Sequence, residues 1–140
     1  MSKNWMNDIA AMHRKYKVNK KVQEFDPEKL NKLLEFRLNF LKEEMKELDQ
    51  AVLDKDAEEV VDALIDLCVV AIGTLDIFEI DSEKAWNKVH EANMNKKVGI
   101  KESRPNPLGL PDLIKPEEWV GPDHSDNHGL LTIIERNSGR

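Results

Sequence analysis

Apolar residues recur at spacings of three and four along most of the first 97 positions, which is the pattern of amphipathic helices. The first two rows are Trp5, Ile9, Met12 and Tyr16, and then Leu30, Leu34, Leu38, Leu41, Met45, Leu48 and Val52. Between them stand Asp26, which suits a helix N-cap, and Pro27, which suits the first helical position. The pattern therefore predicts a short first helix and a long second helix over about 28–53.

Two more helices are predicted before the pattern ends. Asp56 followed by Glu59 has the form of a capping box, which predicts a third helix from that point to about Phe78. A fourth is predicted to start near Asp81 or Ser82 and to end before Gly99. The connections are short, as is typical of antiparallel neighbours. We therefore expect an all-α fold, an antiparallel helical bundle whose four-helix core is completed by oligomerisation.

Proline and glycine are concentrated behind this helical part. Five of the six prolines and five of the six glycines lie at or beyond Gly99, and both residue types interrupt helices and strands. We therefore expect a helical bundle over 1–97 and an irregular tail over 98–140, which packs on the bundle or on a neighbouring subunit. Strand-like alternation is confined to "LLTIIE", at positions 130–135.

Two aspartates interrupt the most apolar stretch of the chain. Every residue from Val60 to Ile72 is apolar except Asp62 and Asp66, and an ionised carboxylate is costly to bury. A helix that is apolar on nearly all sides lies at the centre of a fold or in an oligomer interface. Together with Glu59, the two aspartates fall on one face of the predicted third helix.

The preceding helix carries a matching acidic row, Glu43, Glu44 and Glu47, beside its apolar stripe. Carboxylates brought together from two helices raise one another's pKa and destabilise the fold unless a cation neutralises them. An all-oxygen ligand set favours Mg²⁺, with Mn²⁺ as a substitute. A di-iron bundle is excluded, because none of the four histidines follows a glutamate by three positions. Since phosphates commonly complete a Mg²⁺ site, a nucleotide or another polyphosphate is the expected substrate.

The overall charge limits the classes of partner, and the single cysteine and the apolar runs indicate the cellular compartment. With 27 acidic and 21 basic residues the formal net charge is −6, which argues against a nucleic acid polymer as partner. Cys68 has no second cysteine to pair with, and no apolar run is long enough to span a membrane. We expect a cytoplasmic protein, in a bacterial cell or a phage-infected host.

Three segments carry a family resemblance: "EEMKE" at 43–47, "EEVVDALIDL" at 58–67 and "VHEANMNK" at 89–96. In this order they resemble the MazG-like and phosphoribosyl-ATP pyrophosphohydrolase-like superfamily of all-α nucleotide pyrophosphohydrolases. "KPEEWVGPD" at 115–123 is similar to a C-terminal segment of some phage and bacterial members. The resemblance implies Mg²⁺-dependent cleavage of a (deoxy)nucleoside triphosphate to the monophosphate and pyrophosphate, in a homo-oligomer, either a dimer or a tetramer.

The resemblance also implies roles for particular residues. Glu44 and Glu47 would be the catalytic carboxylates. Two alignments of the second acidic motif are open, one on Glu59 and Asp62 and one on Asp62 and Asp66. All candidates for metal binding are therefore retained: Glu43, Glu44, Glu47, Glu59, Asp62 and Asp66.

The resemblance also implies that Asn93 and Lys96 bind the substrate. Three more candidates come from the sequence rather than from the family pattern. Arg37 is a candidate for phosphate contact, and Lys115 and Trp119 are candidates to fold over an active site. Two rival functions are open. One is hydrolysis of phosphoribosyl-ATP in histidine synthesis, and the other is a non-catalytic helical oligomer with a structural Ca²⁺ or Mg²⁺ site.

Overall fold

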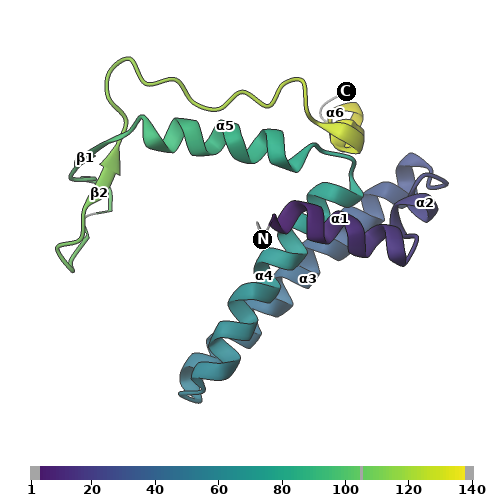
Figure 1. The fold of residues 1–140 in the computed structure, drawn as a ribbon, viewed down its shortest axis with the longest axis horizontal. Coiled ribbons are helices and arrows are strands. Elements are labelled where there is room, and N and C mark those ends of the chain that lie inside the picture. Colours follow the sequence, from purple (N-terminus) through teal and green to yellow (C-terminus); the bar gives the residue numbers. More distant parts are fainter. Residues whose placement is uncertain (1–3, 105, 138–140) are drawn as a thin grey trace. The chain divides into compact units, whose positions relative to one another are not determined.

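The computed structural model describes residues 4–104 and 106–137, which divide into two compact units (Figure 1). The first unit comprises Met1–Ser82 and His128–Arg140, and the second comprises Glu83–Asn127. Because this division separates the long helices from the proline-rich segment, each unit is described by itself.

The first unit contains two long helices, three short ones and one turn of 3-10 helix. They are α1 (Trp5–Lys15), α2 (Val18–Val22), α3 (Pro27–Leu53), α4 (Ala57–Ile77), η1 (Gly129–Leu131) and α6 (Thr132–Asn137). Three of them begin at side-chain caps, in which Asn4, Asp26 and Asp56 accept hydrogen bonds from first-turn N–H groups at 2.8–3.1 Å. These caps satisfy backbone N–H groups that have no partner inside a helix, so the capping residues determine where α1, α3 and α4 begin.

Helices α3 and α4 form an antiparallel pair, with α1 and α2 packed against α4 (Figure 1). The core of the unit gathers where α2, the N-terminal part of α3 and the C-terminal end of α4 meet, and consists of Val22, Leu30, Ile77, Phe78, Ile80 and Ile133. Phe78 is fully buried, and its carbonyl accepts the N–H of Leu130 at 2.7 Å. The C-terminal segment thus completes the core that the first 80 residues begin.

The second unit is built on α5 (Ser82–Met94) and a two-stranded antiparallel sheet of β1 (Lys97–Gly99) and β2 (Asp112–Ile114). After β2 the chain runs back beside α5 (Figure 1), held by the Trp119 indole N–H on the Ala92 carbonyl at 2.7 Å and by Lys88 Nζ on the Asp123 carbonyl at 2.7 Å. The irregular segment is therefore ordered by α5.

The predicted fold class is confirmed, since the described chain is mostly helical. The predicted spans of the second and third helices agree with α3 and α4 to within about two residues. Helix α2 was not predicted, and the fourth helix ends at Met94, five residues before Gly99. The alternating segment 130–135, which is too short to define a sheet, is helical, while the short strands lie at 97–99 and 112–114. Hydrophobic alternation cannot reveal three-residue strands.

Several apolar side chains of α4 remain exposed in the single chain. Val61, Leu64 and Ile65 retain 62%, 48% and 45% of their accessible surface. This is the face for which an oligomer interface was predicted, and that interface stays a prediction. Within the described residues, no helix is both long and apolar enough to cross a membrane.

Replacing Gly129 should destabilise the first unit, because its φ is +52° and an added β-carbon would clash with the Phe78 carbonyl oxygen. We expect Gly129→Ala to lower the free energy of unfolding by about 1–3 kcal/mol in urea denaturation. Gly109→Ala is the matched control, since Gly109 has φ +72° but no atom within 4 Å of the added carbon. Equal losses for both variants would show that the contact with Phe78 has no effect.

Candidate functional site

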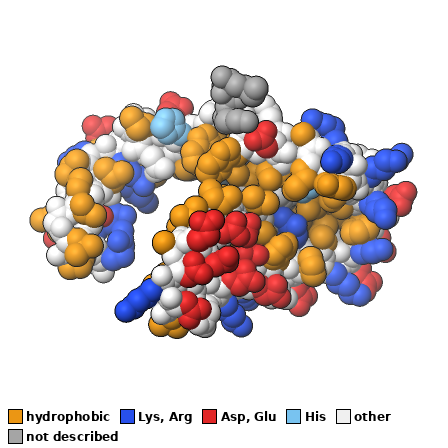
Figure 2. All heavy atoms as spheres, turned by 60° about the horizontal axis from the view of Figure 1, so that its bottom comes forward, with side chains coloured by type: hydrophobic (Ala, Val, Ile, Leu, Met, Phe, Trp, Pro, Cys, Tyr) orange, Lys and Arg blue, Asp and Glu red, His pale blue; other side chains and the backbone are white. Residues whose placement is uncertain are grey.

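Four carboxylates come together on the α3–α4 pair: Glu44 and Glu47 from α3, and Asp62 and Asp66 from α4. Within each helix the two residues lie one turn apart on the same face, and antiparallel packing sets the two acidic rows side by side. Figure 2 shows acidic side chains gathered in one patch with hydrophobic side chains beside it. We call these four residues the carboxylate cluster.

Glu44 is the most constrained member of the carboxylate cluster. It is one of the few buried charged residues, with 8% of its surface exposed, and its Oε2 has no hydrogen-bond partner among the described residues. Burial raises the pKa of Glu44, and the charges of Glu47, Asp66 and Asp62 raise it further. An isolated buried oxygen among like charges is a position that a cation would stabilise.

Asp66 is the corresponding residue on α4 and is half-buried. Its pKa is also raised, first by burial and then by the neighbouring charges of Asp62 and Glu47. Each helix therefore raises a pKa on the other: the α4 carboxylates raise the pKa of Glu44, and an α3 carboxylate raises the pKa of Asp66.

A pocket of about 370 Å³ lies against the buried members of the cluster. Its lining comes from α1, α3 and α4 and consists of Met12, His13, Arg37, Phe40, Glu44, Asp66, Val69 and Val70. Arg37 precedes Glu44 by two helical turns, about 10 Å along the axis. The pocket therefore has carboxylates at one end, a guanidinium at the other and apolar side chains between them.

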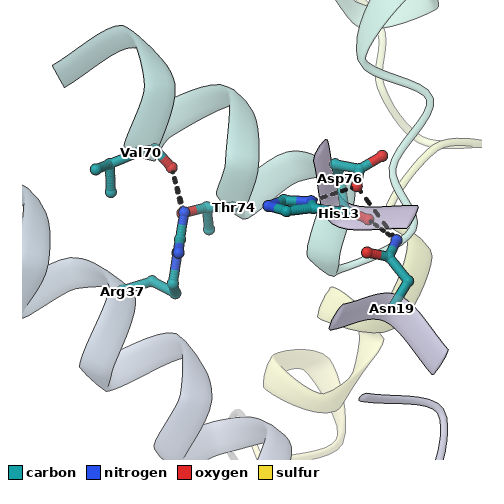
Figure 3. A network of polar contacts seen from close by, with 6 residues as sticks. All are labelled: His13, Asn19, Arg37, Val70, Thr74 and Asp76. Carbon is teal, nitrogen blue, oxygen red and sulfur yellow. Dashed lines mark hydrogen bonds and ion pairs between the residues drawn. The ribbon is translucent and has the colours of Figure 1, made fainter. Parts of the chain in front are cut away.

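Arg37 is held in place by α4 (Figure 3). Its Nε donates to Thr74 Oγ1 at 3.0 Å and its Nη2 to the Val70 carbonyl at 2.9 Å. Burial lowers the pKa of the guanidinium, which among the described residues forms no ion pair. Gly73 makes room for it, because a β-carbon there would lie 2.7 Å from Nη2.

A second network, which the sequence did not predict, joins α1 and α2 to α4 (Figure 3). His13 is 5% exposed, and its Nδ1 lies 2.6 Å from Asp76 Oδ2, so the carboxylate accepts the Nδ1–H. Asn19 Nδ2 donates to the carbonyl and to Oδ2 of Asp76 at 3.1 and 3.2 Å. The other ring nitrogen of His13 points away from Asp76, toward Arg37 and Thr74. The one sign in the sequence that His13 would be buried was its place on the apolar face of α1, one turn after Ile9.

The remaining predicted metal ligands lie outside the cluster. Glu43 is exposed on α3 and Glu59 is exposed in the first turn of α4. The backbone N–H of Glu59 donates to the N-cap Asp56 at 3.1 Å, which confirms the predicted cap. Of the two alignments left open, the structure brings the pair Asp62 and Asp66 to the α3 carboxylates.

The predicted substrate residues divide between the two units. Arg37 belongs to the first unit and lines the pocket. Asn93, Lys96 and Lys115 belong to the second unit, where Asn93 is exposed near the end of α5 and both lysines lie over the ring of Trp119.

The carboxylate cluster suits a hydrated cation. In the described part of the chain, no three His, Cys, Asp or Glu side chains converge closely enough to enclose a metal ion. Mg²⁺, however, keeps several waters and is typically bound through one or two carboxylates together with substrate phosphates. The all-oxygen donor set and the unpartnered Glu44 Oε2 fit that mode of binding.

Residues 11–93 match the family model described as phosphoribosyl-ATP pyrophosphohydrolase. The chain belongs to this family. The phosphoribosyl-ATP pyrophosphohydrolase family lies within the MazG-like superfamily of all-α nucleoside triphosphate pyrophosphohydrolases, so the predicted relationship is confirmed. Membership indicates a nucleotide pyrophosphohydrolase that depends on a divalent metal. A comparison with curated proteins gave no match.

The raised pKa values of Glu44 and Asp66 predict how stability depends on pH in this pyrophosphohydrolase. The folded protein retains protons that the unfolded chain releases, so these groups reduce stability at neutral pH. As the pH falls through the raised values toward the ordinary values of about 4, the metal-free protein should gain free energy of unfolding. Urea denaturation in a chelator between pH 7 and 4.5 measures this gain.

The double variant Glu44→Gln, Asp66→Asn isolates this effect, because it leaves every other titrating group in place. It should be more stable than wild type at pH 7 and should lose the gain on acidification. Mg²⁺ at pH 7 should raise the melting temperature of the wild type but not of the variant. Identical pH profiles for the two proteins would refute the pKa shifts.

Proposed function

We propose that the protein is a Mg²⁺-dependent nucleotide pyrophosphohydrolase that cleaves a (deoxy)nucleoside triphosphate to the monophosphate and pyrophosphate. The observation that carries the proposal is the carboxylate cluster around the buried Glu44, set at one end of a pocket that has Arg37 at the other. Family membership supports the reaction class.

Glu44, Glu47, Asp62 and Asp66 would hold the cation, with the exposed Glu43 and Glu59 as outlying carboxylates at the same helical pair. A Mg²⁺ ion held there, or Mn²⁺ in its place, would supply positive charge to the phosphates and would make a nearby water more acidic. Glu44 or Glu47 then accepts the proton of the attacking water as a general base.

The other side chains of the pocket suit the rest of a nucleotide. Phe40 and Met12 offer an apolar surface for a base or sugar, while Arg37 and the free nitrogen of His13 offer polar contacts beyond it. Asp76 and Asn19 would act on the substrate only through His13, by fixing its ring. Asn93, Lys96 and Lys115 are proposed as further substrate contacts from the second unit.

A second candidate substrate is phosphoribosyl-ATP, which the description of the matching family favours. Both substrates present a triphosphate to the same carboxylates. We also propose a cytoplasmic homo-oligomer, a dimer or a tetramer, because the exposed apolar face of α4 would then be covered.

Pyrophosphate release should distinguish these functions. The protein is incubated with Mg²⁺ and a panel of nucleoside triphosphates, deoxynucleoside triphosphates and phosphoribosyl-ATP, and pyrophosphate is measured separately from phosphate. Glu44→Gln should lower kcat/KM by about 10²–10⁴-fold, since it removes the proposed base. Glu35→Gln, an exposed carboxylate of the same helix, is the matched control and should retain activity.

The two alignments of the second acidic motif are separated by Asp66→Asn and Glu59→Gln. We expect a large loss of turnover for Asp66→Asn and a small one for Glu59→Gln, because Asp66, unlike Glu59, belongs to the carboxylate cluster. Full activity of Asp66→Asn would exclude the proposed site. Absence of turnover on every substrate, with stabilisation by Mg²⁺ intact, would favour a structural metal site instead.

A further inference from the structure

The hydrogen bond to Asp76 fixes the tautomer of His13. A carboxylate oxygen only accepts hydrogen bonds, so the 2.6 Å contact between Asp76 Oδ2 and His13 Nδ1 places the ring proton on Nδ1. Asn19 Nδ2 donates to the same oxygen at 3.2 Å and to the Asp76 carbonyl at 3.1 Å, which holds the carboxylate in this orientation. In the neutral ring, Nε2 therefore carries a lone pair, and it accepts a hydrogen bond but cannot donate one.

This acceptor faces the pocket of about 370 Å³ on the α3–α4 pair. His13 is 5% exposed and lines the pocket, and Figure 3 shows its outer nitrogen pointing toward Arg37. Among the described residues, none forms a hydrogen bond with Nε2. A buried acceptor without a donor is unfavourable, so the position suits a donor that a ligand supplies.

Arg37 places donors next to this acceptor. A β-carbon at Gly73 would stand 2.7 Å from Arg37 Nη2 and 3.6 Å from His13 Nε2, so both nitrogens border the same space beside α4. Arg37 uses one N–H on Thr74 Oγ1 and another on the Val70 carbonyl. No described residue accepts from its other N–H groups. An acceptor and several donors thus lie side by side at this end of the pocket.

Both side chains lie two helical turns from the carboxylate cluster. Arg37 precedes Glu44 by two turns of α3, which is about 10 Å along the axis. Gly73, which borders the ring of His13, follows Asp66 by the same interval on α4. A nucleotide whose phosphates meet the carboxylates therefore presents the outer edge of its base to His13 and Arg37.

The outer edge of a base carries one of two hydrogen-bonding patterns. Cytosine and adenine have an amino group there, which donates, beside a ring nitrogen that accepts. Uracil, thymine, guanine and hypoxanthine have a carbonyl, which accepts, beside a ring N–H. His13 is more deeply buried than the half-buried Arg37, so the outermost group of the base meets the His13 acceptor. An amino group donates to it while the ring nitrogen accepts from Arg37, whereas a carbonyl would face a second lone pair.

We propose that His13 is a specificity residue, which selects nucleotides whose base carries an amino group at its outer edge, of the cytosine or adenine type. Asp76 is a positioning residue that keeps Nε2 an acceptor. This selectivity rests on the proposed function, because the phosphates at the carboxylate cluster direct the base toward His13.

Matched pairs of substrates test the selection directly. CTP and UTP differ only in an amino group that replaces a carbonyl and in the accompanying ring proton, and ATP and inosine triphosphate differ in the same way. Pyrophosphate release is measured with Mg²⁺ at pH 8, where imidazole rings are neutral. We expect kcat/KM to favour the amino member of each pair by about 10²-fold or more. Equal values within both pairs, or a preference for the carbonyl, would overturn the proposal.

Variants then assign the preference to His13. Glutamine offers both a donor and an acceptor, so His13→Gln should reduce the preference within each pair to less than about threefold. Asp76→Leu should reduce it similarly, because either ring nitrogen can then carry the proton. His90→Gln, the same change at an exposed histidine, is the matched control and should keep the full preference. Each ratio compares two substrates on one protein, so a general loss of stability does not alter it. A full preference in His13→Gln would refute the assignment.

Equilibrium binding separates the selection from the proposed reaction. The α,β-methylene analogues of CTP and UTP cannot be cleaved between the α and β phosphates, and calorimetry with Mg²⁺ should show tighter binding of the cytosine analogue. This result in a protein that turns over no nucleotide would refute the proposed function and keep the selection. Turnover with equal kcat/KM within both pairs would keep the proposed function and refute the selection. Failure of both analogues to bind would also overturn the proposal.

Discussion

Helices α3 and α4 bring four carboxylates close together, and the cost of holding these charges near one another constrains the rest of the first unit. Glu44 loses most of its solvent and faces three like charges, and the structure offers its Oε2 no internal partner. Such an arrangement is unfavourable for folding alone. It persists because the helix pair is stabilised elsewhere, at the end where Phe78 and its apolar neighbours are buried.

The first unit therefore separates its apolar core from the carboxylate cluster. The apolar core lies where α2 and the C-terminal segment cover the ends of the long helices, whereas the carboxylate cluster lies farther along the pair. Between them the hydrogen bonds of Arg37 and the His13–Asp76 contact join α1 and α3 to α4. These polar contacts fix side chains of the pocket that the apolar core does not reach.

The sequence was most informative where a local pattern had a direct physical cause. The caps at Asp26 and Asp56 and the helical periodicity located α3 and α4, and the acidic rows at one-turn spacing identified the carboxylates. It was least informative for contacts between residues far apart in the chain. His13 and Asp76 are separated by 63 positions, and neither forms a motif, so only the packing of α1 on α4 could reveal them. The short strands at 97–99 and 112–114 depend similarly on pairing across an irregular segment. The sequence could not show which of Glu59 and Asp66 lies beside the α3 carboxylates, because all the α4 candidates share one face.

The residue types at positions 73 and 37, which are far apart in the sequence, depend on each other. The missing side chain of Gly73 is what lets the Arg37 guanidinium lie against the α4 backbone, where even one added carbon would stand 2.7 Å from Nη2. A larger residue at position 73 is therefore compatible only with a shorter or displaced side chain at position 37. In related chains the two positions should vary together. Gly73, near the C-terminal end of α4, thus leaves space for the Arg37 side chain that crosses from α3.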